Sequence, residues 1–346
     1  MWLSCSSVGR KFVMAVTGAV LVLFVTFHCC MNSIAICWPA AYNSLCEFLG
    51  ANWYALIASV FLAGFIVLHI IYAMILTFQN RKARGNVAYA VSKKPKTVEW
   101  SSKNMLVLGI VILAFLVIHL IQFWAKMQLQ EIRGVHDVLP PAAGTLFLQE
   151  AFATDWTWIV YIIGFIALWF HLNHGIWSMF QSTGWDNTPW IARLKKVACW
   201  WSSLVVLLFI AETIVFTAKA HDNYFKTDPV LRAQYQEMIA PMFEKDFGPD
   251  AARTVAGAPY EQVKQIVNNS VQQMESPQAQ AYMANDPNFA SQLETMKAAK
   301  ALFDYLDEGM ETEIMPLQGI PGPQGPQPAP QAAPQAAPQP SDQPNN

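Results

Sequence analysis

Long apolar stretches dominate the first two thirds of the chain. Each holds enough consecutive apolar residues to cross a bilayer as a helix, which takes about 20 residues, and polar or charged segments separate them. The pattern predicts five membrane-spanning helices, at approximately 12–36, 52–79, 104–126, 156–181 and 198–219. The expected fold class is all-α, built on a five-helix transmembrane bundle.

Beyond the last apolar stretch the pattern changes to short amphipathic segments. Residues 222–315 predict an extramembrane helical extension. Its sequence signals are helix starts at Asp228-Pro229 and Pro259, a third helix over 288–310, and polar turns at Pro277 and Pro287. Residues 316–346 are rich in Pro, Gln and Ala and hold no aromatic residue, which predicts disorder. The expected domains are therefore 1–221, 222–315 and 316–346.

Composition and charge indicate a membrane protein with a defined orientation. Hydrophobic residues make up 54% of the chain and charged residues 13%, which is atypical of a soluble domain and does not suggest a nucleic-acid partner. Residues 1–221 hold 15 Lys/Arg against 8 Asp/Glu, whereas residues 222–346 hold 7 against 16. Of those 15 basic residues, 12 lie in the N-terminal segment and alternate loops and 3 on the other side. The positive-inside rule then places the N-terminus in the cytoplasm and the C-terminus outside.

The start of the chain is similar to a signal peptide, because Arg10 and Lys11 precede an apolar run. The run continues through His28 with no A-x-A-like cleavage site soon after it. We therefore expect an uncleaved first span.

The six cysteines do not form a cofactor motif. The sequence contains no CxxCH and no paired CxxC motifs, so neither covalent haem nor a zinc or iron–sulfur site is indicated. Cys37 and Cys46 either form a disulfide in an oxidising compartment or are two small apolar thiols.

Four histidines supply the strongest functional signal, because each lies in a different apolar stretch: His28, His69, His119 and His171. An ionisable residue inside a bilayer is costly and is a functional-site hypothesis by default. A single histidine there is often a packing residue, but four on separate helices are the arrangement that a bundle needs to hold haem between facing imidazoles. A His-lined proton or metal pathway is the rival hypothesis.

Depth along the helices sorts these histidines into two pairs. At about 1.5 Å per residue, His28 and His119 lie roughly 6–10 Å below the outer polar edge, and His69 and His171 roughly 24–25 Å below it. The sequence thus predicts two bis-histidine haems stacked across the membrane. His174 shares a helix face with His171 and is the alternative ligand. The remaining histidines, His136 and His221, lie in an outer loop and at an outer helix end.

Around these histidines the chain resembles the dihaem cytochrome b membrane anchor of succinate:quinone oxidoreductases, in its single-chain five-helix type. The resemblance covers roughly residues 6–220. The stretches that carry it are SSVGRKFVMAVTG, FVTFH, VLHIIYA, LVIHLIQFW and HLNHGIWSMFQSTGW. The last is the most specific, and in its register His171 is the ligand and Gly175 follows it.

The resemblance implies a subunit without flavin, located in the bacterial cytoplasmic membrane. It implies two b haems, held by His69/His171 nearer the catalytic subunits and by His28/His119 nearer the outside. The implied partners are a flavoprotein subunit and an iron–sulfur subunit on the cytoplasmic side, membrane quinone (menaquinone above all), the lipid bilayer and a homodimer of the complex. The basic loop at 81–103 is a candidate docking site for the iron–sulfur subunit.

The acids and bases near the expected haems have two interpretations each. Glu47, in the first outer loop, is either a quinone and proton ligand or a surface acid, and Glu212 either joins that site or, as we favour, pairs with Lys219 or His221. Cations at the cytoplasmic boundary either bind haem propionates or only set topology: Arg10, Lys11, Arg81 and Arg84.

The chain also departs from the family. Trp169 stands where some relatives carry a membrane-embedded glutamate, two residues before the fourth ligand. The acidic extension after residue 222 is longer than the family leads us to expect.

Overall fold

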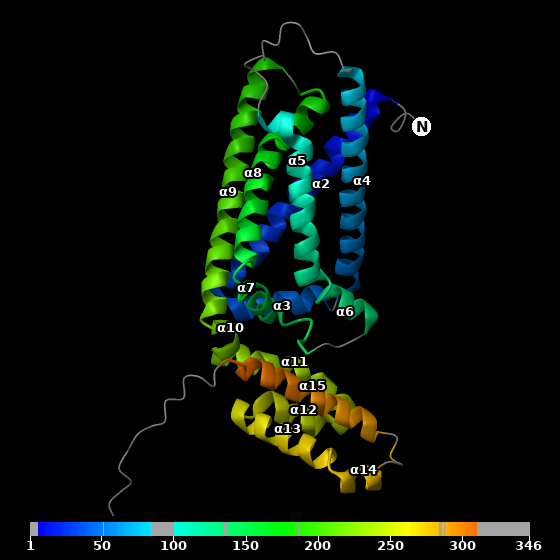
Figure 1. Ribbon diagram of the computed structural model, residues 1–346, viewed down its shortest axis with the longest axis vertical. Helices are drawn as coiled ribbons and strands as arrows, with labels where there is room; N and C mark the ends of the chain where they lie inside the picture. Colours follow the sequence, from blue (N-terminus) through cyan, green and yellow to red (C-terminus); the bar gives the residue numbers. More distant parts are fainter. Residues whose placement is uncertain are drawn as a thin grey trace, which may run out of the picture. The chain divides into compact units, whose positions relative to one another are not determined.

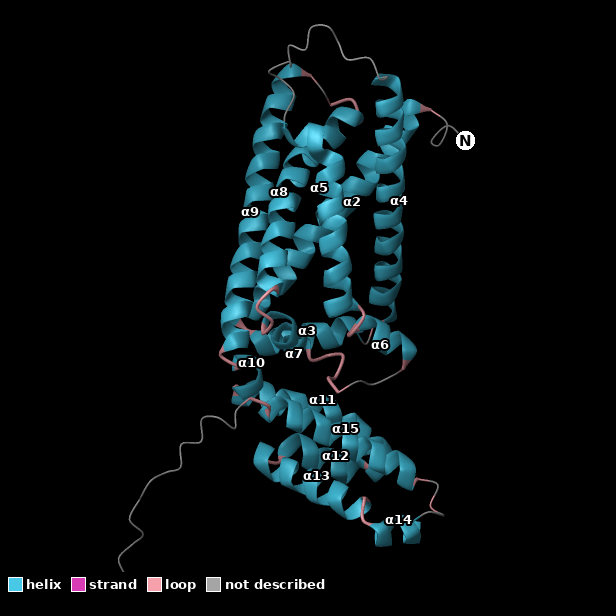
Figure 2. Cartoon of the chain, viewed as in Figure 1, coloured by secondary structure: helices cyan, strands magenta, loops and turns pink. Residues whose placement is uncertain are grey.

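The computed structural model describes residues 6–50, 52–84, 100–134, 138–185, 187–283, 286 and 288–309. All regular secondary structure in these ranges is helical (Figures 1 and 2). The segment 85–99, His136, Pro287 and the predicted disordered tail lie outside the described residues.

The bundle contains the five predicted spans, in elements long and apolar enough to cross a membrane. They are α2 (Ser7–Cys37), α4 (Trp53–Arg84), α5 (Trp100–His119) with its continuation η1 (Leu120–Trp124), α8 (Thr157–Ser182) and α9 (Thr188–His221). The all-helical class and the number of spans are therefore confirmed, and the chain is built as a multi-pass membrane protein.

The spans begin where polar side chains cap them. Ser6 Oγ accepts a hydrogen bond from Gly9 N at 2.9 Å at the start of α2. Asn187 Oδ1 accepts one from Trp190 N at 3.2 Å at the start of α9. Both satisfy amide groups that a helix terminus leaves without a partner.

Packing in the bundle centres on α8, which contacts α2, α5 and α9. The most apolar window of α4 contains no buried residue, and exposed side chains such as Val60 and Phe61 cover it. In a bilayer such side chains lie against lipid tails, so the helix needs no protein neighbour on that face.

Short helices connect the spans at the end of the bundle where α2 finishes and α8 begins (Figure 1). They are α3 (Pro39–Gly50), α6 (Gln128–Arg133) and α7 (Gly144–Phe152). Eight of the nine residues of α7 are buried, so this connection is part of the protein core rather than a surface loop.

The extension is a set of helices formed by α10 (Tyr224–Thr227), α11 (Pro229–Phe247), α12 (Pro249–Gly257), α13 (Tyr260–Met274), α14 (Pro277–Met283) and α15 (Phe289–Asp307). Asp228 caps α11 by accepting from the amides of Val230 and Leu231, both at 3.0 Å, and Pro259 is the N-cap residue of α13, at the helix start that the sequence predicts. The polar turn predicted at Pro277 is confirmed by a turn at Glu275 and a bend at Ser276, and the proline itself then opens α14, a position where its missing N–H costs nothing.

Burial in the extension follows the helical period. On α11 the buried apolar residues are Leu231, Tyr235, Ile239 and Phe243, spaced four apart, and they share one core with valines of α13 and with leucines and Phe303 of α15. The same cluster of buried side chains continues into the bundle. The described residues between Ser6 and Leu306 belong to one compact unit, and Asp307–Gly309 are the described residues of a second.

A buried polar network joins α3, α7 and α11. Asn43 Oδ1 accepts from both the amide and the hydroxyl of Thr145 at 2.9 Å, and its Nδ2 donates to Gln234 Oε1 at 3.0 Å. The Thr145 hydroxyl lies 2.7 Å from that of Tyr235, whose pKa is raised by burial. Because these groups satisfy one another, the polar atoms are buried without the cost of lost hydrogen bonds.

Asn43→Ala should destabilise the protein by about 2–3 kcal/mol, because a buried donor that loses its acceptor costs about 1–3 kcal/mol. The expected result is a lower midpoint of thermal unfolding in detergent, in proportion to that loss. Asn269→Ala makes the same chemical change at an exposed position of α13 and should leave the midpoint unchanged. Equal midpoints for Asn43→Ala and the wild type would show that the network does not contribute.

Asp246 makes the extension sensitive to acid. Thr295 and Ser291 of α15 donate to its carboxylate, and these hydrogen bonds lower its pKa. A carboxyl whose pKa is lower in the folded state stabilises the fold at pH values above its pKa in the unfolded state. That stabilisation is lost as the pH falls through its pKa in the folded state.

Asp246→Asn should therefore lose part of the acid-induced drop in the thermal midpoint, whereas Glu237→Gln, exposed on the same helix, should keep the wild-type profile.

Candidate functional site

The structure brings the four histidines together as two pairs of facing rings. The ring centres of His28 on α2 and His119 on α5 lie 5.7 Å apart, with the planes at 85°. Those of His69 on α4 and His171 on α8 lie 6.3 Å apart at 61°. Each pair thus joins two different spans.

The distance between the two histidine pairs along the bundle can be estimated from residue counts on α2 and on α8. On α2, Thr17 contacts His69, and His28 lies 11 residues further along, or about 16 Å in an α-helix. On α8, Tyr161 contacts His119, and His171 follows 10 residues later, or about 15 Å. The two measurements agree on two distinct levels.

Hydroxyl groups fix the tautomer of one ring in each pair. Thr17 Oγ1 lies 3.1 Å from His69 Nδ1 and donates its own proton to the carbonyl of Val13 at 2.9 Å. Its oxygen therefore accepts from His69 Nδ1–H, which leaves the lone pair of that imidazole on Nε2. Assigned in this way from the hydrogen bonds, Nε2 is the nitrogen available to a metal.

The other pair repeats this arrangement with different residues. Tyr161 Oη lies 3.1 Å from His119 Nδ1 and donates to Gln122 Oε1 at 3.0 Å. The phenol proton is thus committed, so His119 donates from Nδ1 and its Nε2 carries the lone pair. The sequence analysis did not identify Thr17, Tyr161 and Gln122 as site residues. The signal that could have found them is a hydroxyl or amide side chain in an otherwise apolar span.

The surroundings of both pairs fit a haem iron held between two imidazoles. A metal about 2 Å from one nitrogen of each ring places the ring centres roughly 6 Å apart, as observed in both pairs. His171 Nδ1 is buried and has no hydrogen-bond partner among the described residues, which in an apolar interior indicates a further group at this ring. At Gly18, a Cβ would lie 3.6 Å from His69 Cε1, so the backbone of α2 comes close to this ring.

Each histidine pair offers two imidazoles and no third side chain of a typical zinc site within the described residues. In the described part of the chain, no three His, Cys, Asp or Glu residues come together at a distance suited to a metal. Zinc takes three or four protein ligands, whereas a haem iron, already held by its macrocycle, needs only the two axial positions.

The remaining candidate residues lie outside these pairs. His174 stacks edge-on against Trp177, with ring centres 4.9 Å apart, and Trp169 Nε1 donates to Ser203 Oγ at 2.9 Å. Arg10 is half-buried, and Lys11 and Arg81 are exposed. The side chain of Arg84 is outside the described residues.

The two acids differ in their surroundings. Glu47 is exposed on α3, whereas Glu212 on α9 is buried and accepts from Ser33 Oγ at 2.7 Å. Cys29, next to His28 in sequence, also donates to the same oxygen, at 3.8 Å. The buried carboxyl of Glu212 is thus bonded to the residue that follows His28 in the sequence.

The pairing favoured for Glu212 from the sequence is wrong. Lys219 instead donates to the carbonyl of Ile36 at 2.9 Å, and His221 lies 3.8 Å from Asp155. Cys37 and Cys46 are free thiols in the structure.

Comparison of the chain with protein-family profiles, with curated proteins and with solved structures finds no match in any of the three.

Gly164 of α8 keeps Tyr161 close to His119, because a Cβ at this position would lie 2.6 Å from Cγ of Phe115 on α5. Gly164→Ala should therefore force α5 and α8 apart and lower stability by about 1–3 kcal/mol, as overpacking does. The check is the thermal midpoint in detergent. Gly109→Ala on α5, where a Cβ would meet nothing within 4 Å, should not lower it. Equal midpoints in the two variants would contradict this close packing.

Proposed function

We propose that the chain is a dihaem cytochrome b that anchors a respiratory enzyme in the membrane and exchanges electrons with quinone. The observation that carries this proposal is the pair of His–His contacts at two levels, each joining two spans. Each b haem supplies uptake and release of one electron at a time. His28 and His119 would hold one haem, and His69 and His171 the other.

The residues around the rings prepare them for this role. The hydroxyls of Thr17 and Tyr161 fix the orientation of His69 and His119 and make their Nε2 atoms better ligands, as carboxylate or carbonyl partners do in other metal sites. Phe24 stacks on His28 and Phe115 on His119. These aromatic rings exclude water from the 28/119 pair. The low dielectric would increase the effect of nearby charges on the reduction potential of a haem held there.

The wider assignment rests on the resemblance in the spans. The chain would be the non-flavin subunit of a succinate dehydrogenase or fumarate reductase, passing electrons between menaquinol and an iron–sulfur subunit that serves a flavoprotein. The excess of Lys/Arg in the N-terminal segment and alternate loops supports a cytoplasmic position for those partners. Arg10 lies in the first turn of α2 and Arg81 in the last turn of α4. The start of α2 and the end of α4 lie at the same end of the bundle (Figure 1), the end nearer the 69/171 pair, where the two arginines would bind haem propionates.

Two other functions predict different properties. The anchor of a hydrogenase or formate dehydrogenase would also hold two haems, but it would purify with a nickel- or molybdenum-bearing subunit instead of a flavoprotein. A His-lined transporter would show no haem absorption. The paired rather than clustered histidines favour the cytochrome.

The test is a dithionite-reduced minus oxidised visible spectrum of the purified chain, made with adequate haem supply, together with a pyridine haemochrome count. Two b haems per chain are expected. His69→Ala and His171→Ala should each lose the same haem, and His28→Ala and His119→Ala the other, because removal of one axial ligand opens the site. His174→Ala, three residues from a ligand on the same helix, is the matched control and should keep both.

The outcomes separate the hypotheses. A chain with no haem would contradict the cytochrome and favour the transporter. Loss of both haems from every one of the four variants, with normal folding, would contradict the two-level arrangement. Loss from His174→Ala but not from His171→Ala would reassign the ligand on α8.

A further inference from the structure

Three buried side chains share one face of the connecting helix α7. Thr145, Gln149 and Phe152 are spaced four and three residues apart, so they lie on the same side of the helix. Their exposed fractions are 0%, 2% and 3%. A helix of about two turns therefore connects the groups that these three side chains contact.

The extension holds the first of these side chains. The Thr145 hydroxyl lies 2.7 Å from that of Tyr235 on α11, and Tyr235 donates to the carbonyl of Phe225 on α10 at 2.9 Å. The second side chain, Gln149, donates from Nε2 to the carbonyl of Ala220 at the end of α9, at 2.7 Å. The position of α7 thus depends on hydrogen bonds to the extension and to the helix that leads into it.

The third side chain contacts the surroundings of the 28/119 pair. Phe152 packs edge-on against Tyr161, with ring centres 5.1 Å apart, and also contacts Phe216 on α9 at 5.8 Å. Tyr161 is the residue whose oxygen accepts from His119 Nδ1. A displacement of α7 would therefore move the phenol that orients this histidine.

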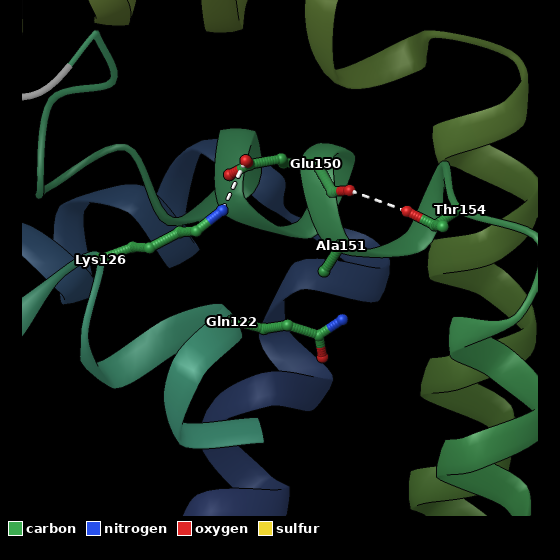
Figure 3. A pocket seen from close by; sticks show the side chains of 5 residues that line it. All are labelled: Gln122, Lys126, Glu150, Ala151 and Thr154. Atoms are coloured by element: carbon green, nitrogen blue, oxygen red, sulfur yellow. Dashed lines mark hydrogen bonds and ion pairs between the residues drawn. The ribbon is translucent and has the colours of Figure 1, made fainter. Parts of the chain in front are cut away.

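The other side of α7 leaves room for such a displacement. A cavity of ≈ 270 Å³ is lined there by Gln122, Lys126, Glu150, Ala151 and Thr154 (Figure 3). Lys126 and Glu150 form an ion pair at its wall, with side chains that are 37% and 40% exposed, so solvent screens their attraction. On this side close packing does not hold the helix, so its position depends on the hydrogen bonds of the opposite face.

We propose that the extension positions the 28/119 pair by acting through α7 on Tyr161, an inference that rests on the proposed function. Tyr235 and Thr145 are then positioning residues for His119. The hydrogen bond to Tyr161 makes the His119 imidazole a more basic ligand, which favours oxidised iron. The extension thereby lowers the reduction potential of the haem that His28 and His119 would hold.

The 69/171 pair is outside the reach of this arrangement. His69 is oriented by Thr17, which donates its own proton to the carbonyl of Val13. These hydrogen bonds involve only α2 and α4. A change in the extension should therefore leave the haem at His69 and His171 unaffected.

The test uses the full-length protein with His69→Ala, which by the proposed function keeps only the haem of the 28/119 pair. The measured quantity is the ratio of reduced to oxidised haem at one fixed potential. Tyr161→Phe should raise this ratio about two- to tenfold, because it removes one hydrogen bond. Tyr235→Phe should raise it about twofold, and should add nothing when Tyr161→Phe is already present, because both act on the same hydrogen bond.

Matched variants separate positioning from a general loss of stability. Val263→Ala shortens a buried side chain of α13 in the same extension, so it should lower the thermal midpoint without changing the ratio. Thr145→Val removes the hydroxyl on α7 and should reproduce the effect of Tyr235→Phe, whereas Thr145→Ser keeps the hydroxyl and should give the wild-type ratio. With His28→Ala, which keeps the other haem, none of these variants should change the ratio.

The outcomes distinguish this inference from the proposed function. An unchanged ratio in both Tyr235→Phe and Thr145→Val would overturn the inference and leave the cytochrome in place. An equal rise in Val263→Ala, or a rise from Tyr235→Phe that persists beside Tyr161→Phe, would also overturn it, because the extension would then act by another route. A wild-type chain without haem would contradict the proposed function, and the inference with it.

Discussion

The hydrogen bond between a hydroxyl and a histidine ring, inside a span, is the interaction on which this bundle depends. Lipid tails are as apolar as leucine, so hydrophobic burial does little to choose which spans associate. A polar ring in that environment must find a partner in the protein. Thr17 on α2 meets His69 on α4, and Tyr161 on α8 meets His119 on α5. These contacts fix which helices are neighbours and at what height, and the two levels of facing rings follow from them.

The extension obeys a different constraint. Its amphipathic helices bury one face each against a shared core of Leu231, Tyr235, Val267, Phe303 and their neighbours. The buried network of Asn43, Thr145 and Tyr235 connects these two kinds of packing. Its members come from α3, α7 and α11, so it holds the connecting segments of the bundle against the extension by hydrogen bonds. The chain itself enters the extension only through the end of α9.

Much of this organisation could be predicted from the sequence, because it is local in origin. The five spans follow from apolar length, the helix starts at Asp228 and Pro259 from capping chemistry, and the association of His28 with His119 from depth counted in residues. Contacts between side chains on different helices could not be predicted. Nothing near Glu212 in the sequence points to Ser33, and Tyr161 looks like any interfacial aromatic until α5 lies beside it. The turn before Pro277 was predicted but the helix that this proline begins was not, because a proline that begins a helix and one that makes a turn have the same local signature.

The contact of α3 and α7 with α11 has a topological consequence. Residues that touch outside the bilayer must be on the same side of it, so any two of these elements are separated along the chain by an even number of crossings. Two spans separate α3 from α7, two more separate α7 from α11, and a single span precedes α3. The folded contacts therefore require an even number of crossings between these elements. If one span between α3 and α11 failed to cross, Asn43 and Tyr235 would lie on opposite faces of the membrane. The extension could then not close onto the bundle. Correct insertion of the spans between α3 and α11 is thus a precondition for closing the extension onto the bundle.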